Sequence, residues 1–295
     1  AVRVRQKALL SARSVPYVPK PAPVRDRLLL AFVLLMSAAM LAVIGMAVFG
    51  SFVKVWPYNL SFTLNHYTYG FEEAGVENAY RNSLTMAAWC ALIGALLTFA
   101  GAYWLEKTRG ADLVRPIVRL QAMLPMAIPG LVLGIGYILF FNHPANPLNV
   151  LYGTMGILVL STIVHFYSSS HLTAVTALKQ LDNEFESVSA SLKVPFYKTF
   201  WRVTVPVCLP SIIDISRYYF VNAMTTISAV VFLYSPKTTL AAISILHLDE
   251  AGNVGAAAAM ATLIVATSAV VTAVFFVVEW LLVNRTQAWR RGSRT

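Results

Sequence analysis

Six long apolar stretches constrain this chain more than any other feature of its sequence. They cover residues 28–53, 83–105, 117–141, 149–174, 209–233 and 256–283. A helix needs about 20 residues to cross the hydrocarbon core of a bilayer, and each stretch meets that length. Backbone polar groups inside lipid must be paired within the segment, so each stretch is predicted to be a helix. The sequence therefore predicts an all-α integral membrane protein with six transmembrane helices.

The composition supports a membrane protein and argues against two other classes. The 295 residues are 58% hydrophobic and only 12% charged, whereas about 25% charged residues is usual in soluble domains. The formal net charge of +10 would suit a nucleic-acid partner, but the basic residues lie between apolar stretches rather than along one surface. Cys90 and Cys208 stand far apart, with no CxxC pair or His cluster beside them. We therefore expect no nucleic-acid partner and no metal or redox site.

The basic residues are divided unequally between the two sides of the predicted membrane. Nineteen of the 23 Lys and Arg residues fall on one side, three on the other, and Arg217 lies within the fifth stretch. Because Lys and Arg are retained in cytoplasmic segments, both termini are predicted to be cytosolic. Residues 1–27 then form a basic cytosolic tail, or a linker if the chain was cut from a longer polypeptide. The six-span domain covers 28–285, and 286–295 is a second basic tail.

Two segments between the predicted spans differ in character. Residues 54–81 are polar and aromatic, and are expected to form an external loop with short local structure. Residues 176–208 are compatible with helix but too polar to span, and they lie on the positive, cytosolic side. An apolar residue recurs there at every fourth position: Val188, Leu192, Phe196 and Phe200. Pro195 should divide this segment into two short helices. The pattern leaves open an amphipathic helix pair in the headgroup plane and a docking surface for a partner.

The second half of this segment resembles the coupling loop of bacterial binding-protein-dependent ABC importers. The run from Phe200 to Pro206 (FWRVTVP), with its spacing from Leu192, is similar to the closing run of that loop. The first half departs from the family pattern. Ser187, Val188 and Ser189 stand where the family has Glu-Ala-Ala, Glu186 is one place early, and Lys193 replaces the usual Gly.

Two more runs are similar to one branch of this family. Residues 124–137 (LPMAIPGLVLGIGY) resemble the third span of its iron(III), polyamine and phosphonate permeases. Residues 223–237 (AMTTISAVVFLYSPK), followed by 248–252 (LDEAG), look like the permeases assigned to 2-aminoethylphosphonate uptake. The resemblance implies a multi-pass permease subunit in a bacterial inner membrane, and a phosphonate such as 2-aminoethylphosphonate as substrate. Iron(III) and polyamine are the alternative substrates within the branch.

The same resemblance implies a set of partners. These are a dimer of ABC ATPases that binds ATP and Mg, a periplasmic solute-binding protein, membrane lipid, and a second permease subunit. That second subunit is identical, homologous, or a homologue fused upstream of Ala1. The sequence holds no G-x-x-x-x-G-K-[ST] phosphate loop, and nothing resembles a catalytic triad or a paired-carboxylate site. We therefore expect no cofactor and no enzymatic activity in this chain, with ATP hydrolysed by a separate protein.

The candidate site residues form two groups. Residues expected to couple the chain to the ATPase are Glu186, Ser187, Ser189, Leu192, Lys193, Phe196, Phe200 and Pro206, with Phe196 and Phe200 as buried anchors in the ATPase groove. Polar residues at membrane depth usually face a watery path, and the candidates for lining it are Ser161, His165, Asn222, Thr225, Thr226 and Ser228. A Ser or Thr hydroxyl can instead bond to a carbonyl one turn back in its own helix.

Proline and glycine in the third stretch, from Pro125 to Gly136, are expected to kink that span. Such interrupted spans are also typical of secondary transporters driven by an ion gradient, which is the alternative class of function. That alternative needs carboxylates at membrane depth, and only Asp214 and Glu279 occur, both near span ends. Asp214 is expected to form a local ion pair with Arg217.

Overall fold

The computed structural model describes residues 22–68, 76–107, 113–181 and 184–286. The chain divides into two compact units, Ala1–Met46 and Ala47–Thr295. Most of the two predicted basic tails, 1–27 and 286–295, lies outside the described residues.

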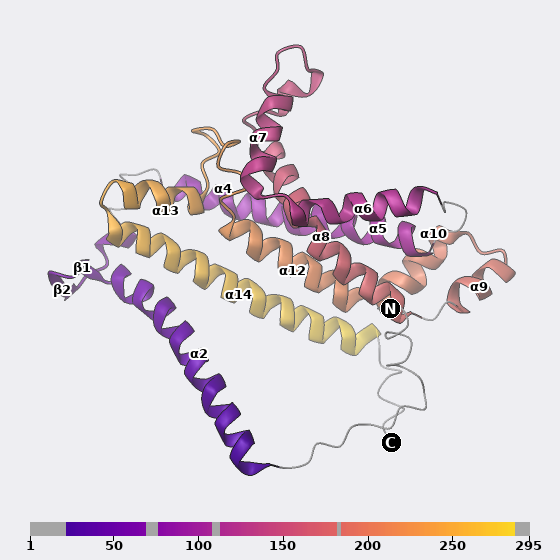
Figure 1. Cartoon of the computed structure of the whole chain (residues 1–295), viewed down its shortest axis with the longest axis horizontal. Coiled ribbons are helices and arrows are strands. Elements are labelled where there is room, and N and C mark those ends of the chain that lie inside the picture. The colour runs from indigo at the N-terminus through magenta and orange to yellow at the C-terminus, as the bar shows by residue number, and fades with distance from the viewer. Residues whose placement is uncertain (1–21, 69–75, 108–112, 182–183, 287–295) are drawn as a thin grey trace. The chain divides into compact units, whose positions relative to one another are not determined.

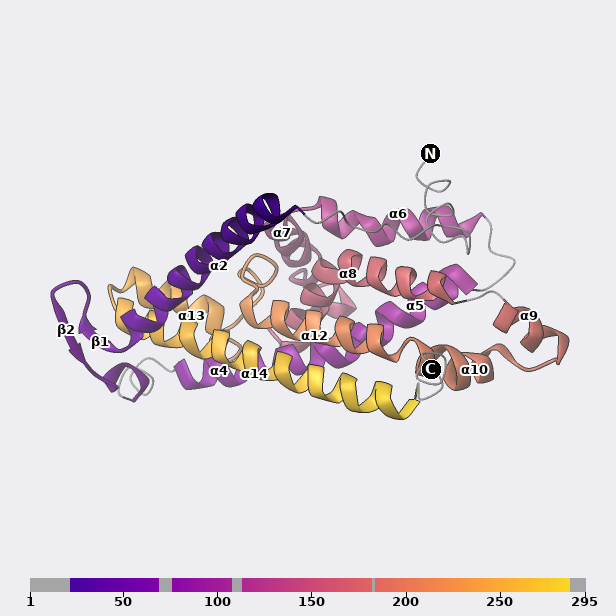
Figure 2. The ribbon, with the colours of Figure 1, turned by 90° about the horizontal axis from the view of Figure 1, so that it is seen from below.

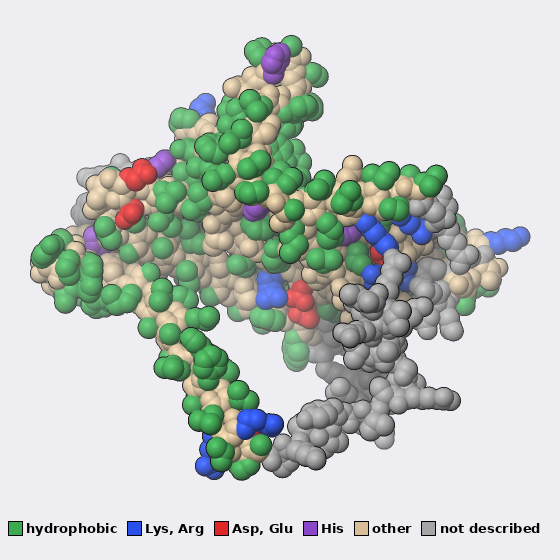
Figure 3. Space-filling model, in the orientation of Figure 1, with side chains coloured by type: hydrophobic (Ala, Val, Ile, Leu, Met, Phe, Trp, Pro, Cys, Tyr) green, Lys and Arg blue, Asp and Glu red, His purple; other side chains and the backbone are tan. Residues whose placement is uncertain are grey.

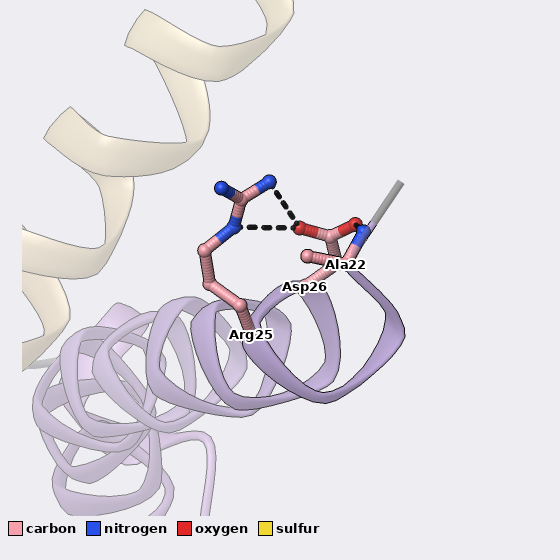
Figure 4. Close-up of polar contacts among 3 residues, drawn as sticks. All are labelled: Ala22, Arg25 and Asp26. Atoms are coloured by element: carbon pink, nitrogen blue, oxygen red, sulfur yellow. Dashed lines mark hydrogen bonds and ion pairs between the residues drawn. The ribbon is translucent and has the colours of Figure 1, made fainter. Parts of the chain in front are cut away.

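The first unit contains most of helix α2 (Pro23–Ser51), which is apolar nearly all round after Arg27. At its start the Asp26 carboxylate accepts a hydrogen bond from the Ala22 N–H (3.2 Å) and pairs with Arg25 (3.1 Å), as Figure 4 shows. An acidic side chain at a helix N-terminus satisfies free amide groups and interacts well with the helix dipole. Charges therefore mark the end of α2 where its apolar stretch begins.

The second unit contains a small hairpin and the remaining helices. A hairpin of β1 (Val53–Val55) and β2 (Asn59–Phe62) is followed by the 3-10 turn η1 (Asn65–Tyr67). The long helices are α4 (Val76–Trp89), α5 (Ala95–Lys107), α6 (Val114–Ala127), α7 (Gly130–Phe141), α8 (Met155–Gln180), α12 (Leu209–Thr225), α13 (Ala241–Glu250) and α14 (Val254–Thr286). Shorter helical pieces are η2 (Cys90–Gly94), η3 (Pro147–Leu151), α9 (Glu184–Ser191), α10 (Phe196–Thr199), η4 (Phe200–Thr204) and α11 (Val205–Val207). The hairpin, inside the predicted external loop, is a departure from an all-α fold.

Helices α5, α8 and α12 run side by side and form the core of this unit (Figures 1 and 2). Tyr219 of α12 is fully buried, and its ring lies so close to Gly94 that a Cβ there would approach ring atoms to 2.9 Å. The Tyr219 hydroxyl shares a hydrogen bond with Thr98 Oγ1 (2.8 Å). Gly94 lies in η2, a π-helical turn that joins α4 and α5, so close helix packing depends on glycine at this turn.

Three helices in the described residues are long and apolar enough to span a membrane: Pro23–Ser51, Val76–Lys107 and Val254–Leu282. They coincide with the first, second and sixth predicted spans. Helices α6 and α7 also pass this test as a pair, but they are bent by 111°. The total of six spans and the side on which the termini lie stay predictions.

The third predicted span is not one kinked helix but two helices with a break between them. Proline lacks an N–H and disfavours helical backbone in the residue before it. Ile128 is accordingly extended (φ −101°, ψ 124°), and Pro129 caps α7. Figure 1 shows α7 pointing away from the direction of α6. The expected interruption at these Pro and Gly residues is therefore present as a sharp bend of 111°, and a single span there stays a prediction.

Two further boundaries differ from those predicted. Helix α12 ends at Thr225, and residues 226–234 form a largely buried non-helical segment instead of completing the stretch to 233. Residues 241–250, expected within an outer loop, form helix α13. In both regions neighbouring helices bury the apolar residues, so these residues do not need to belong to one long spanning helix.

Candidate functional site

The break between α6 and α7 meets two of the predicted path residues. Gly130 opens α7, and a Cβ at this position would lie 2.5 Å from Ser228 Oγ and 3.0 Å from His165 Cε1. His165 belongs to α8, and Ser228 to the non-helical segment after α12. Three elements therefore converge at one point, where only glycine leaves room for the neighbouring side chains.

His165 brings an unsatisfied polar atom to this junction. Its Nδ1 is buried and has no hydrogen-bond partner among the described residues, while its ring packs edge-to-face on Phe166 with centroids 4.7 Å apart. Buried polar atoms in native proteins nearly always have a partner, so each exception needs an explanation. A polar solute or a water molecule passing the break would supply the missing hydrogen bond.

Ser168 lies one turn after His165 on α8 and supports the end of α6. Its hydroxyl donates to the Ala122 carbonyl (2.7 Å) and accepts from the Met126 N–H (3.2 Å). These two backbone groups are four residues apart, in the register of a helix hydrogen bond, beside Pro125. A side chain at such a position stabilises a bent helix end. Ser168 therefore holds the helix that precedes the break.

Three of the other path candidates use their polar groups within the protein. Ser161 is fully buried and donates to the Ala229 carbonyl (2.7 Å), which ties α8 to the non-helical segment. Asn222 Nδ2 donates to the Tyr218 carbonyl (2.8 Å), one turn back in α12. Thr225 Oγ1 likewise donates to the Val221 carbonyl (3.2 Å). Thr226 is buried at the C-terminal end of α12. The polar groups of Asn222 and Thr225 are therefore used within their own helix, which is the alternative to lining a path.

A cavity of about 440 Å³ lies between the start of α4, the segment 236–239 and α13. Its lining is Val76, Asn78, Ala79, Asn82, Pro236, Thr239, Ser244, His247, Leu248 and Ala251. Asn82 Nδ2 donates to the carbonyls of Lys237 and Thr239 (both 3.0 Å), and Ser83 Oγ accepts from the Ala241 N–H (2.8 Å). The sequence analysis did not name these residues as site candidates, although the polar pair Asn82-Ser83 at the start of an apolar stretch was a usable signal.

The predicted coupling segment is two short helices joined by a turn. Lys193 has φ 54°, and the Val194 N–H donates to the Ser189 carbonyl (2.9 Å), which closes the end of α9. Leu192 and Phe196 are 70% and 69% exposed. Ser187 is exposed as well, and its carbonyl accepts from the Ser191 hydroxyl (3.0 Å). The Glu186 side chain lies outside the described residues.

Phe200 lies differently from Phe196. Its ring packs against Tyr103 of α5 (centroids 4.6 Å apart) and against Phe99 (6.0 Å). This packing makes the Phe200 ring less accessible to a partner than that of Phe196, and its role as an anchor stays a prediction. The sequence predicted the break at Pro195 but not the π-helical turn η4, which begins at Phe200. Pro206, in α11, is half-buried between η4 and α12.

Charged side chains near the predicted cytosolic end are paired. Arg217 donates to Asp214 Oδ1 (2.7 Å), as predicted, and its guanidinium lies 4.8 Å from the centroid of the Phe276 ring on α14. Arg119 of α6 pairs with Glu106 of α5 (2.6 Å), and that carboxylate is only 11% exposed. Sequence reasoning missed this second pair, because its partners lie in different helices. Among the described residues no group of three or more His, Cys, Asp or Glu side chains could hold a metal ion.

This chain matches one protein family and several curated transport proteins. The family described as "Binding-protein-dependent transport system inner membrane component" matches residues 98–283. The ferric transport system permease protein FbpB of Actinobacillus pleuropneumoniae is 30% identical over 82% of this chain, and the match covers 34% of FbpB. The chain thus spans about a third of the length of this ferric relative. The putative 2-aminoethylphosphonate permease PhnV of Salmonella paratyphi A is 26% identical over 70% of this chain and 75% of PhnV.

Comparison with solved structures concerns the fold. One chain of a bacterial alginate ABC transporter, crystallised with an alginate-pentasaccharide-bound periplasmic protein, superimposes with a TM-score of 0.67. The superposition covers 88% of this chain and 95% of that chain, with 17% sequence identity. The arrangement of helices is therefore shared with a solved ABC transporter.

Proposed function

The chain belongs to the family of binding-protein-dependent transport system inner membrane components, and on that premise we propose that it is one permease subunit of an ATP-driven importer. In this proposal it forms half of a translocation path and receives energy from a separate ATPase dimer. The second half of the path comes from an identical or homologous subunit. A soluble solute-binding protein delivers the substrate.

The observation that carries this proposal is the exposure of the coupling segment. Leu192 directly follows α9 and Phe196 begins α10, two short helices that do not span, and both large apolar side chains are about 70% exposed. Exposed apolar side chains on a helical projection are typical anchors for a hydrophobic groove in a partner. Phe200, packed on Tyr103, attaches the same segment to α5. One end of the segment is thus available to a partner, and the other is fixed to the bundle.

A pair of phenylalanine variants tests this division. Phe196→Ala should leave the thermal stability of the purified chain unchanged, because the side chain is exposed, and should reduce ATPase binding and ATP-dependent uptake. Phe200→Ala should lower the thermal midpoint, because it removes aromatic packing worth about 1–3 kcal/mol. ATPase pull-down, thermal unfolding in detergent and uptake in proteoliposomes give the three readouts. Normal ATPase binding and uptake by Phe196→Ala would contradict the proposal.

The path proposal places a small polar solute at the break between α6 and α7. His165, Ser228 and the start of α7 offer an imidazole, a hydroxyl and backbone amides, which are neutral groups suited to the oxygens of an oxyanion. This chemistry favours a phosphonate such as 2-aminoethylphosphonate. The second candidate is iron(III), since FbpB matches more of the chain at higher identity than PhnV does.

A binding assay separates the candidate substrates. The solute-binding protein that delivers substrate to this permease should be titrated with 2-aminoethylphosphonate, inorganic phosphate, iron(III) and spermidine by calorimetry. Tight binding of 2-aminoethylphosphonate alone would support the phosphonate proposal, and tight binding of iron(III) alone would replace it. Vanadate should abolish uptake of the bound solute. Uptake that continues in vanadate and stops when the ion gradient is dissipated would instead support a secondary transporter.

A further inference from the structure

The hairpin that follows α2 exposes an unusually apolar surface. The exposed residues, here called the hairpin surface, are Val55, Trp56, Tyr58, Leu60, Phe62 and Leu64, with exposed fractions from 48% to 89%. Residues 52–67 contain Lys54 and His66 but no Asp or Glu. Figure 3 shows hydrophobic side chains covering this end of the molecule. Such a surface is unfavourable in water.

The base of the hairpin is fixed to the first turn of α14. Val53 is buried, and its carbonyl is 2.9 Å from His66 Nε2. The His66 ring lies directly against Gly255, where any Cβ would collide with it. Tyr67 donates a hydrogen bond to Ser51 Oγ (2.7 Å) at the end of α2. The hairpin therefore has a fixed position at this end of α14.

The length of α14 indicates how deep in a membrane the hairpin lies. Its apolar part, Val254–Leu282, has 29 residues and is about 43 Å long at 1.5 Å per residue. The hydrocarbon core is about 30 Å thick. The ends of such a helix reach the headgroup layers, so the hairpin held against Gly255 lies at headgroup level.

Two opposing constraints keep the hairpin at that level. Within the described residues the sheet has two strands, so each strand has one edge whose backbone N–H and C=O groups have no strand partner there. Such edges cannot enter the hydrocarbon core, where unpaired backbone groups are costly. The apolar side chains, in turn, disfavour full exposure to water. The headgroup layer satisfies both constraints, and Trp and Tyr are enriched there.

We propose that the hairpin surface is a lipid-binding anchor that lies in the headgroup layer and holds the adjoining ends of α2 and α14 at the membrane surface. Its charge agrees with this partner. Lys54 is the only residue with a permanent charge between Phe52 and Tyr67. A segment with a cation and no carboxylate is attracted to anionic phospholipids. On α13, by contrast, Asp249 and Glu250 are exposed acidic side chains.

Spin labels at two positions test the depth of the hairpin. Tyr58 is 89% exposed, and Glu250 is exposed on α13, so Tyr58→Cys and Glu250→Cys are a matched pair. The native cysteines, Cys90 and Cys208, are 0% and 4% exposed, so a nitroxide reagent should react with the introduced cysteine. The full chain, in the complex it forms, is reconstituted into vesicles of phosphatidylethanolamine and phosphatidylglycerol. Electron paramagnetic resonance then measures collisions with oxygen and with a water-soluble nickel chelate.

The label at position 58 should collide more often with oxygen and several-fold less often with the nickel chelate than the label at 250. Equal access of the chelate to both labels would overturn the proposal. Shielding of the label at 58 from both reagents would overturn it too, because that result indicates a protein partner. As an independent measurement, brominated phospholipids should quench the tryptophan fluorescence of the wild type more than that of Trp56→Phe, and identical quenching would contradict lipid contact at the hairpin.

Discussion

Lys193 has a backbone conformation that its side chain disfavours. Among the described residues it is the only non-glycine residue with positive φ (54°), and it follows the last turn of α9. The hydrogen bond from the Val194 N–H to the Ser189 carbonyl closes that turn in the manner of a glycine-terminated helix. The left-handed conformation costs an L-residue with a Cβ about 1–2 kcal/mol. Lys193→Gly removes this cost.

The expected gain follows from three contributions. Glycine relieves about 1–2 kcal/mol of strain and loses about 0.5–1 kcal/mol more backbone entropy than alanine on ordering. The lysine charge also stabilises the C-terminal end of α9 by about 0.3–1 kcal/mol, and glycine lacks it. Lys193→Ala lacks the charge but keeps the Cβ. Relative to this control, Lys193→Gly should therefore stabilise the turn by about 0.5–1 kcal/mol, or about two- to five-fold in its opening equilibrium.

Hydrogen exchange measures this difference directly. The Val194 amide exchanges when the turn opens, so its peptide should exchange about two- to five-fold more slowly in Lys193→Gly than in Lys193→Ala. Peptides from α14 provide an internal reference that neither substitution should change. Equal exchange in the two variants, or slower exchange in the alanine variant, would refute the argument from backbone strain.

Two further substitutions test close contacts. Gly130→Ala should lower uptake, and it should lower the free energy of unfolding by about 1–3 kcal/mol, because the new Cβ would lie 2.5 Å from Ser228 Oγ. Adding Ser228→Gly to this variant should restore its stability. Gly136→Ala is the control that should lose no stability, since a Cβ there meets nothing within 4 Å. Asn82→Asp should lower the thermal midpoint in detergent, since it replaces two donated hydrogen bonds with repulsion between carboxylate and carbonyls and costs about 1–3 kcal/mol. Asn78→Asp, exposed one turn earlier on α4, should change it by less than about 0.5 kcal/mol, and equal losses at both positions would contradict a specific role for Asn82.

The parts of the fold that the sequence predicted well are those set by a property of one segment. Length and hydropathy located α2, the helix from Val76 to Lys107, and α14, because a long apolar helix satisfies its backbone within itself. The turn at Pro195 followed from the missing N–H of proline. The Asp214–Arg217 pair followed from the spacing of three residues on one helix. None of these required knowledge of a neighbouring element.

The parts that the sequence did not predict depend on contacts between segments. The apolar run after Thr225 looked like continued helix, but Ala229 and Val230 are fully buried in a non-helical segment. Non-helical backbone at membrane depth is tolerated where protein buries it and satisfies its polar groups. Ser161 on α8 does so by donating to the Ala229 carbonyl. No periodicity within residues 209–233 carries that information.

Phe196 and Phe200 occupy equivalent positions in the sequence pattern but differ in the structure. Contacts of Phe200 connect the coupling segment with the helices that lead to the path. Phe200 is packed on Tyr103 of α5. Two residues earlier, Gly101 lies so close to the Tyr167 hydroxyl of α8 that a Cβ there would approach it to 2.9 Å. Tyr167 lies two residues after His165, which borders the break between α6 and α7. Close contacts therefore join the segment that offers Phe196 to a partner with α5, and α5 with α8, and the rigid helix α8 carries His165 at the junction where the path is proposed. Close-packed interiors transmit displacement because they have little free volume to absorb it, so movement of the coupling segment would reach the break through these contacts.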